Sequence, residues 1–102
     1  MSELRYVEVF VIFLSPENGG RKSSFYLDDH GYKPHFRIPP DGEYLGVEFV
    51  DGPDNLPPGN QTYATVRFLY EPDICYDALV VGAEFEILEG PRVIGYGTVT
   101  RR

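Results

Sequence analysis

The chain has 102 residues, of which 42% are hydrophobic and 15% aromatic, and its formal net charge is −7 at neutral pH. This length and apolar content predict one globular domain over residues 1–102 and exclude both a second domain and a disordered chain. The single cysteine, Cys75, excludes an internal disulfide, and no apolar run approaches the roughly 18 residues that a membrane span needs. Because no secretory signal pattern is present either, we expect a cytoplasmic protein without membrane contacts.

Apolar residues recur with a period of two along most of the chain, which is the pattern of strands and not of helices. In chain order, the apolar faces that we expect are formed by Val7, Val9, Val11 and Phe13, by Leu45, Val47 and Phe49, by Ala64, Val66, Phe68 and Tyr70, by Phe85 and Ile87, and by Val93 and Val99 with Gly95 and Gly97 between them. A shorter strand is expected near residues 34–38. Glycine and proline pairs separate these runs and supply the backbone angles of turns. The pattern predicts an all-β fold, and we favour a small closed barrel because closure leaves no exposed sheet edge.

The negative charge is concentrated in the middle of the chain. Residues 1–40 carry five basic and five acidic groups, residues 41–91 carry eleven acidic groups against Arg67 alone, and residues 92–102 carry three basic groups. Nucleic-acid affinity depends mainly on clustered lysine and arginine side chains that contact phosphates. The distribution therefore argues against DNA binding and against general RNA binding, and leaves only the N-terminal part suited to phosphate contact.

Three stretches of the chain carry distinctive motifs. Residues 14–21 read Leu-Ser-Pro-Glu-Asn-Gly-Gly-Arg and are followed by Phe25, residues 31–36 read Gly-Tyr-Lys-Pro-His-Phe, and residues 82–99 follow the pattern G-x-x-F-x-I-x-E-G-x-R-x-x-G-x-G-x-V in unbroken register. Together these stretches resemble the C-terminal β-barrel domain, domain III, of translation elongation factor Tu. The resemblance covers about residues 7–100 and implies a small six-stranded antiparallel barrel of Greek-key type.

In the elongation factor family, domain III performs no chemistry. It packs against the GTPase domain and the second barrel, helps to hold the T-stem of aminoacyl-tRNA, and is contacted by the nucleotide exchange factor. The present chain has no G-x-x-x-x-G-K-S/T phosphate loop, which excludes GTP hydrolysis by this chain alone. We therefore expect no enzymatic activity and no cofactor, and a stand-alone interaction module that binds a protein partner, in one version an immunity or decoy protein.

The resemblance implies two overlapping sets of contact residues. The partner-binding set comes from the Gly-Gly-Arg and Gly-Tyr-x-Pro loops and consists of Gly19, Gly20, Arg21, Tyr32, Lys33 and Pro34. The alternative function is binding of tRNA or another translation-associated RNA, for which the matching positions are Lys33, His35, Glu89 and Gly90. Against RNA binding, Glu84 stands where the family usually has arginine, and Pro91 replaces a glycine.

A metal-dependent enzyme is the third candidate function. Side chains of the types that bind divalent metals are found at Asp28, Asp29, His30 and His35. However, Asp-Asp-His-Gly is also an ordinary turn sequence, so we predict no metal site.

Two glutamates, the cysteine and the aromatic residues allow further interpretations. Glu84 and Glu86 lie two apart on one strand face, as an acid-base pair could, but outward-facing alternation is the simpler explanation. Cys75 has no activating neighbour in the sequence, and we expect it to be a small buried hydrophobe. The aromatic content also allows a homodimer face, which the sequence leaves open.

Overall fold

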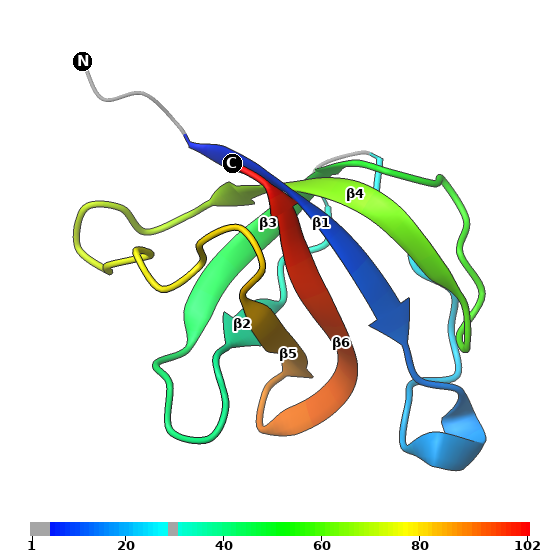
Figure 1. Ribbon diagram of the computed structural model, residues 1–102. Coiled ribbons are helices and arrows are strands. Elements are labelled where there is room, and N and C mark those ends of the chain that lie inside the picture. The colour runs from blue at the N-terminus through cyan, green and yellow to red at the C-terminus, as the bar shows by residue number, and fades with distance from the viewer. Residues whose placement is uncertain (1–4, 29–30) are drawn as a thin grey trace.

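Within residues 5–28 and 31–102, which the computed structural model describes, six strands close into a barrel (Figure 1). The strands are β1 (Tyr6–Phe13), β2 (His35–Arg37), β3 (Leu45–Asp51), β4 (Gln61–Phe68), β5 (Glu84–Glu89) and β6 (Arg92–Arg101), and a 3₁₀ turn, η1 (Pro16–Asn18), follows β1. Their order around the barrel is β1-β4-β3-β2-β5-β6, and every neighbouring pair is antiparallel. The predicted all-β class and closed six-stranded barrel are confirmed, as is the short strand near residues 34–38.

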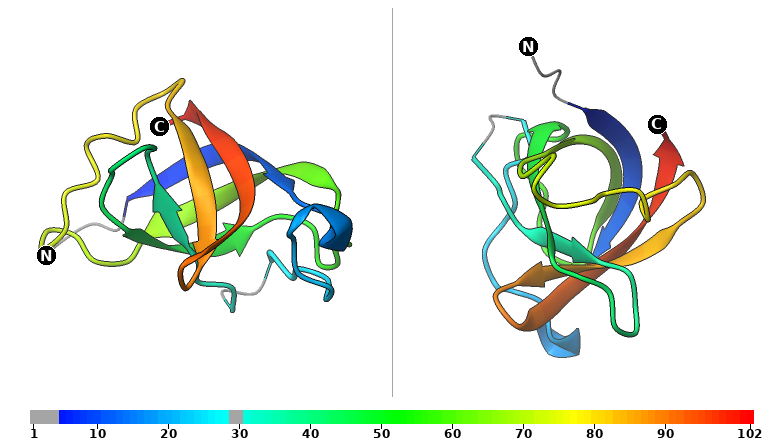
Figure 2. Two further views of the ribbon diagram at one scale, coloured as in Figure 1. Left: turned by 90° about the horizontal axis from the view of Figure 1, so that it is seen from below. Right: turned by 90° about the vertical axis from the view of Figure 1, so that its left-hand side faces the viewer.

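The strand order contains two overlapping Greek keys. β2, β3 and β4 lie side by side in chain order, whereas β1 lies beside β4 and β5 lies beside β2. This arrangement requires two long connections, residues 14–34 between β1 and β2 and residues 69–83 between β4 and β5. Figures 1 and 2 show these connections at opposite ends of the barrel, the first near the β5–β6 turn and the second near the C-terminus.

Each long connection inserts an aromatic ring into one end of the barrel. The residues of β1 alternate between buried and accessible positions, as the sequence predicts, and Phe13 ends its buried face. Phe25 from the first connection stacks on Phe13 with ring centroids 3.9 Å apart, and Tyr76 from the second stacks on Phe68 at 4.3 Å. Because neither inserted ring has exposed surface, both connections are part of the hydrophobic core.

The second connection is anchored to β3 by a buried hydrogen bond. The Tyr76 hydroxyl donates to the carbonyl of Gly46 at 2.6 Å. The ring of Tyr70 covers the same strand, since a Cβ added at Gly46 would lie 2.2 Å from it. Tyr70 was expected to continue the apolar face of β4, and this is wrong: the strand ends at Phe68, and Tyr70 lies beyond it with 51% of its surface exposed.

The last strand also departs from the expected pattern. A register shift between Ile87 and Leu88 makes Ile94, and not Val93, fully buried. The close approach expected at the strand glycines is confirmed, because a Cβ at Gly97 would lie 2.5 Å from the Phe85 ring.

The burial expected for Cys75 is wrong as well. This residue is exposed, because its neighbour Tyr76 takes the position inside the barrel. Among the described residues, no helix has the length and apolar character required to cross a membrane.

Candidate functional site

The first long connection and the β5–β6 turn meet at one end of the barrel. The guanidinium of Arg92 donates hydrogen bonds to the carbonyls of Gly19 and Gly20 at 2.8 and 2.9 Å. The Gly20 amide in turn donates to the Ser15 carbonyl at 2.8 Å. The backbone of the Gly-Gly-Arg loop is therefore held from both sides.

Arg21 lies at the centre of this region, and each of its three guanidinium nitrogens has a hydrogen-bond acceptor. Nη1 lies 2.9 Å from a carboxylate oxygen of Glu89, and Nη2 donates to the Ser24 carbonyl at 2.7 Å. The guanidinium carbon also lies 4.0 Å from the centroid of the Phe25 ring, which is a cation-π distance. These contacts tie the loop to both the core and the β5–β6 turn.

Tyr32 joins the same carboxylate. Its hydroxyl donates to the Glu89 oxygen that Arg21 contacts, at 2.6 Å. Burial of the ring raises the pKa of Tyr32 well above its usual value, and the hydrogen bond to Glu89 raises it further. The phenol is therefore a neutral donor throughout the physiological pH range.

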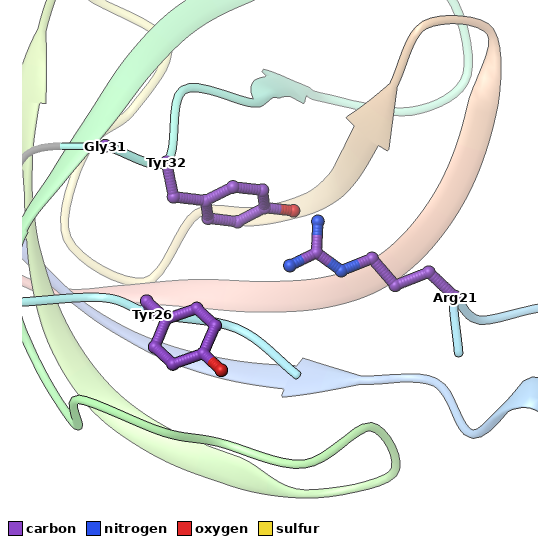
Figure 3. Close-up of a pocket in the computed structure, with 4 residues that line it drawn as sticks. All are labelled: Arg21, Tyr26, Gly31 and Tyr32. Atoms are coloured by element: carbon purple, nitrogen blue, oxygen red, sulfur yellow. The ribbon is translucent and has the colours of Figure 1, made fainter. Parts of the chain in front are cut away.

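A cavity of about 330 Å³ opens beside this network, and its described lining consists of Arg21, Tyr26, Gly31 and Tyr32. Figure 3 shows the guanidinium of Arg21 directed toward the Tyr32 hydroxyl, with the ring of Tyr26 below that of Tyr32. Tyr26 is 53% exposed. A cavity lined by a guanidinium and two tyrosine rings is suited to contacts with carboxylate, carbonyl and aromatic groups of a partner.

The predicted partner-binding residues divide between scaffold and surface. Gly20 and Pro34 are buried, and a Cβ at Gly20 would lie 1.8 Å from the Leu14 carbonyl oxygen. These two residues therefore shape the loops and contact no partner directly. Arg21 and Tyr32 are half-buried, while Gly19 and Lys33 are exposed.

The predicted RNA-contact residues lie in the same region. His35 of β2 is paired in register with Leu88 of β5, which places it beside the Glu89–Gly90 turn. Lys33 lies two residues before His35, with its ammonium 3.8 Å from the Glu48 carboxylate. The two predicted sets meet at Glu89, whose carboxylate already accepts hydrogen bonds from Arg21 and Tyr32.

The predicted metal ligands are only partly described. Asp29 and His30 lie outside the described residues. Asp28 is exposed, and the half-buried His35 packs its ring against Tyr44 with centroids 5.6 Å apart. Within the described part of the chain, no group of three or more histidine, cysteine, aspartate or glutamate side chains is placed to hold a metal ion.

Two residues of this region, Tyr26 and Arg92, were not among the predicted contact residues. Arg92 occupies a fixed arginine position of the 82–99 pattern, which was the available signal. Tyr26 follows the core residue Phe25 and lies outside the three motif stretches. No model of a known protein family matches the chain.

Proposed function

We propose that this protein is a non-catalytic module that binds a protein partner through its loop-turn surface, which is formed by Gly19, Arg21, Tyr26, Tyr32, Gly90 and Arg92. The observation that carries the proposal is the 330 Å³ cavity between Arg21 and two tyrosines. Tyrosine and arginine are enriched at the energetic centres of protein interfaces. Because the network around Glu89 already orders Arg21 and Tyr32, little conformational entropy is lost when a partner binds.

The similarity of the sequence to domain III of elongation factor Tu supports a protein partner. In that family the region of the Gly-Gly-Arg and Gly-Tyr-x-Pro loops faces the GTPase domain, and this chain has no phosphate loop of its own. A separately encoded protein that docks on these loops is one partner consistent with the proposal. An immunity or decoy protein, which presents the same surface to a toxin or regulator, is another.

RNA binding is the second candidate, and the two arginines of the loop-turn surface, Arg21 and Arg92, favour it. The first long connection contributes Arg21, Lys22 and Lys33, and the start of β6 contributes Arg92. His35 lies beside the β5–β6 turn. Against it, the carboxylate of Glu89 lies within the surface, and residues 41–91 are strongly acidic. A charge balance of this kind weakens phosphate contacts.

A capture experiment with matched variants tests the proposal. The tagged protein is incubated with lysate of its host, with and without nuclease, and each recovered protein is purified and titrated against the wild type, Tyr26→Ala and Tyr6→Ala. Both tyrosines are about half exposed, at 53% and 48%, but only Tyr26 lines the cavity. An Arg21 variant is unsuitable, because loss of the guanidinium also loosens the loop.

We expect nuclease-resistant binding that Tyr26→Ala weakens by at least about tenfold, the effect of losing an interface hot spot, and that Tyr6→Ala preserves. Equal affinities of the two variants contradict the assignment of the surface. Recovery of tRNA without protein, with affinity that falls steeply with salt, supports the RNA alternative instead.

A further inference from the structure

The outer face of the barrel over β4, β1 and β6 carries apolar side chains that the core does not use. Across these strands Phe10 pairs with Tyr63 of β4 and with Thr98 of β6, and Ile12 pairs with Tyr96 of β6. We define the outer aromatic face as the four apolar side chains among them, Phe10, Ile12, Tyr63 and Tyr96. The solvent-facing side of an antiparallel sheet is usually polar, so these residues need a separate explanation.

The members of this face are accessible in the monomer. Tyr63 is 69% exposed, Tyr96 48% and Ile12 42%. The rings of Phe10 and Tyr63 lie 4.9 Å apart and tilted, so they already form a packed aromatic pair. An exposed apolar patch of this kind on a small protein marks an interaction surface.

A groove of about 340 Å³ runs beside this face. It is lined by Phe10, Ile12, Pro39, Glu84, Phe85, Tyr96, Gly97 and Thr98. Pro39, from the β2–β3 connection, reaches the groove from outside the β1–β6 sheet. This volume falls within the range of about 300–1,000 Å³ that is typical of ligand pockets.

Glu84 carries the only charge among the described residues that line the groove. It is exposed and lies directly across from Thr98. The neighbouring carboxylates of this sheet have cationic partners, since Glu86 lies 2.8 Å from Arg37 and Glu8 lies 3.9 Å from Arg101. No described residue forms an ion pair with Glu84. Its negative charge is therefore available to a cation that binds in the groove.

We propose that the groove receives an arginine or lysine side chain of a partner protein, presented in a segment whose flanking residues are apolar. The Glu84 carboxylate attracts the cation, and the ring of Tyr96 provides a cation-π surface. The apolar flanks of the segment pack on the outer aromatic face. A second copy of this chain fits poorly, because its net charge of −7 opposes self-association.

This inference does not depend on the loop-turn surface. Glu84 and Tyr96 come from the outer side of β5 and β6, whereas Arg21 and Tyr26 belong to the first long connection. Variants of one surface are therefore expected to leave the other unchanged, so the two proposals fail separately.

A titration with three acetylated and amidated tripeptides tests the inference. The probes are Leu-Arg-Leu, Leu-citrulline-Leu, in which a neutral isostere replaces arginine, and Leu-Glu-Leu. Each is added to the ¹⁵N-labelled protein, and the amide shifts of residues 10–12 and 96–98 are followed. The same titrations are repeated with Glu84→Gln, Tyr96→Ala and the control Tyr26→Ala.

We expect saturable shifts at residues 10–12 and 96–98 with Leu-Arg-Leu, and an affinity about three- to tenfold higher than that of the citrulline peptide. Glu84→Gln reduces this difference, Tyr96→Ala weakens both peptides and the arginine peptide more, and Tyr26→Ala changes neither. Equal affinities of the arginine and citrulline peptides for the wild type, or shifts confined to residues that do not line the groove, overturn the proposal. The wild type is also tested for self-association by sedimentation. Dimerisation that increases with concentration and is lost in Tyr96→Ala assigns the face to a second copy and overturns the proposal as well.

Discussion

Strand β5 carries three glutamates that differ in their number of partners. We expect the loss of stability on removing each carboxylate to increase with that number. Glu84 has no ion pair with any described residue. Glu86 lies 2.8 Å from the guanidinium of Arg37. Glu89 accepts hydrogen bonds from both Arg21 and Tyr32. We therefore expect the alanine variants to be destabilised in the order Glu84, Glu86, Glu89.

The size of each effect follows from these contacts. Hydrogen bonds to charged groups contribute about 1.5–3 kcal/mol each, and the side chains of Arg21 and Glu89 are 25% and 31% exposed, so solvent screening reduces the sum. We expect Glu89→Ala to lower the free energy of unfolding by about 2 kcal/mol and Glu86→Ala by about 1 kcal/mol. Glu84→Ala is expected to change it by less than about 0.5 kcal/mol.

Urea unfolding followed by tyrosine fluorescence measures these differences, since the chain contains eight tyrosines and no tryptophan. The urea dependence is expected to stay constant, so that each change appears in the midpoint. Thermal unfolding provides a second measure, with a decrease of about 8–16 °C for Glu89→Ala. If Glu89→Ala is as mild as Glu84→Ala, the Glu89 network does not hold the loop-turn surface, and the account of its preorganisation is wrong.

Three further predictions concern the connections and the site. Tyr76→Phe leaves the carbonyl of Gly46 without its 2.6 Å hydrogen bond and is expected to lower the free energy of unfolding by about 1–3 kcal/mol, measured by urea unfolding. Gly20→Ala places a Cβ 1.8 Å from the Leu14 carbonyl oxygen, so we expect loss of the folded loop, measured by amide hydrogen exchange. Because the pKa of Tyr32 is raised in the folded state, its contribution to stability is fully present below pH of about 10 and is lost as the pH rises further. Tyrosinate absorbance during alkaline titration measures this, and Tyr32→Phe is expected to remove a late ionisation step.

Matched variants separate the loss of these specific contacts from the general effect of a substitution on stability. Tyr63→Phe removes a hydroxyl from a ring that is 69% exposed, and we expect a change within about 0.5 kcal/mol. Gly19→Ala introduces a Cβ with nothing within 4 Å at a φ of +99°. Its cost is the left-handed backbone alone, about 1–2 kcal/mol. A Gly20→Ala protein as stable as Gly19→Ala contradicts the clash at Leu14.

The period of two in the sequence was sufficient to predict the strands. The alternation at Val7, Val9, Val11 and Phe13 reports which side of β1 faces the core, because successive side chains of a strand point to opposite faces. It failed where the pairing is irregular. The register shift in the β5–β6 pairing puts Ile94 in the core in place of Val93. A shift of this kind depends on the partner strand and leaves no signal in the sequence of β6 itself.

The candidate site was predicted in part. Arg21 and Tyr32 were found through their motifs, and the structure brings both to Glu89. The opposite roles of Gly20 and Gly19 were not predictable, since both are glycines of one loop and only the position of the Leu14 carbonyl distinguishes them. Tyr26 also required the fold, because it becomes part of a cavity only when the Arg21 side chain lies beside it.

The sequence by itself determined the β class, the approximate strands, the turns between them and the uneven charge, because these depend on contacts between near neighbours and on composition. Only the tertiary structure decided which distant side chains meet. Closure of the barrel aligns Phe10, Tyr96 and Glu84, which lie on three different strands, around one groove. Register across a sheet is set by the packing of all six strands at once, and no single segment of the chain contains that information.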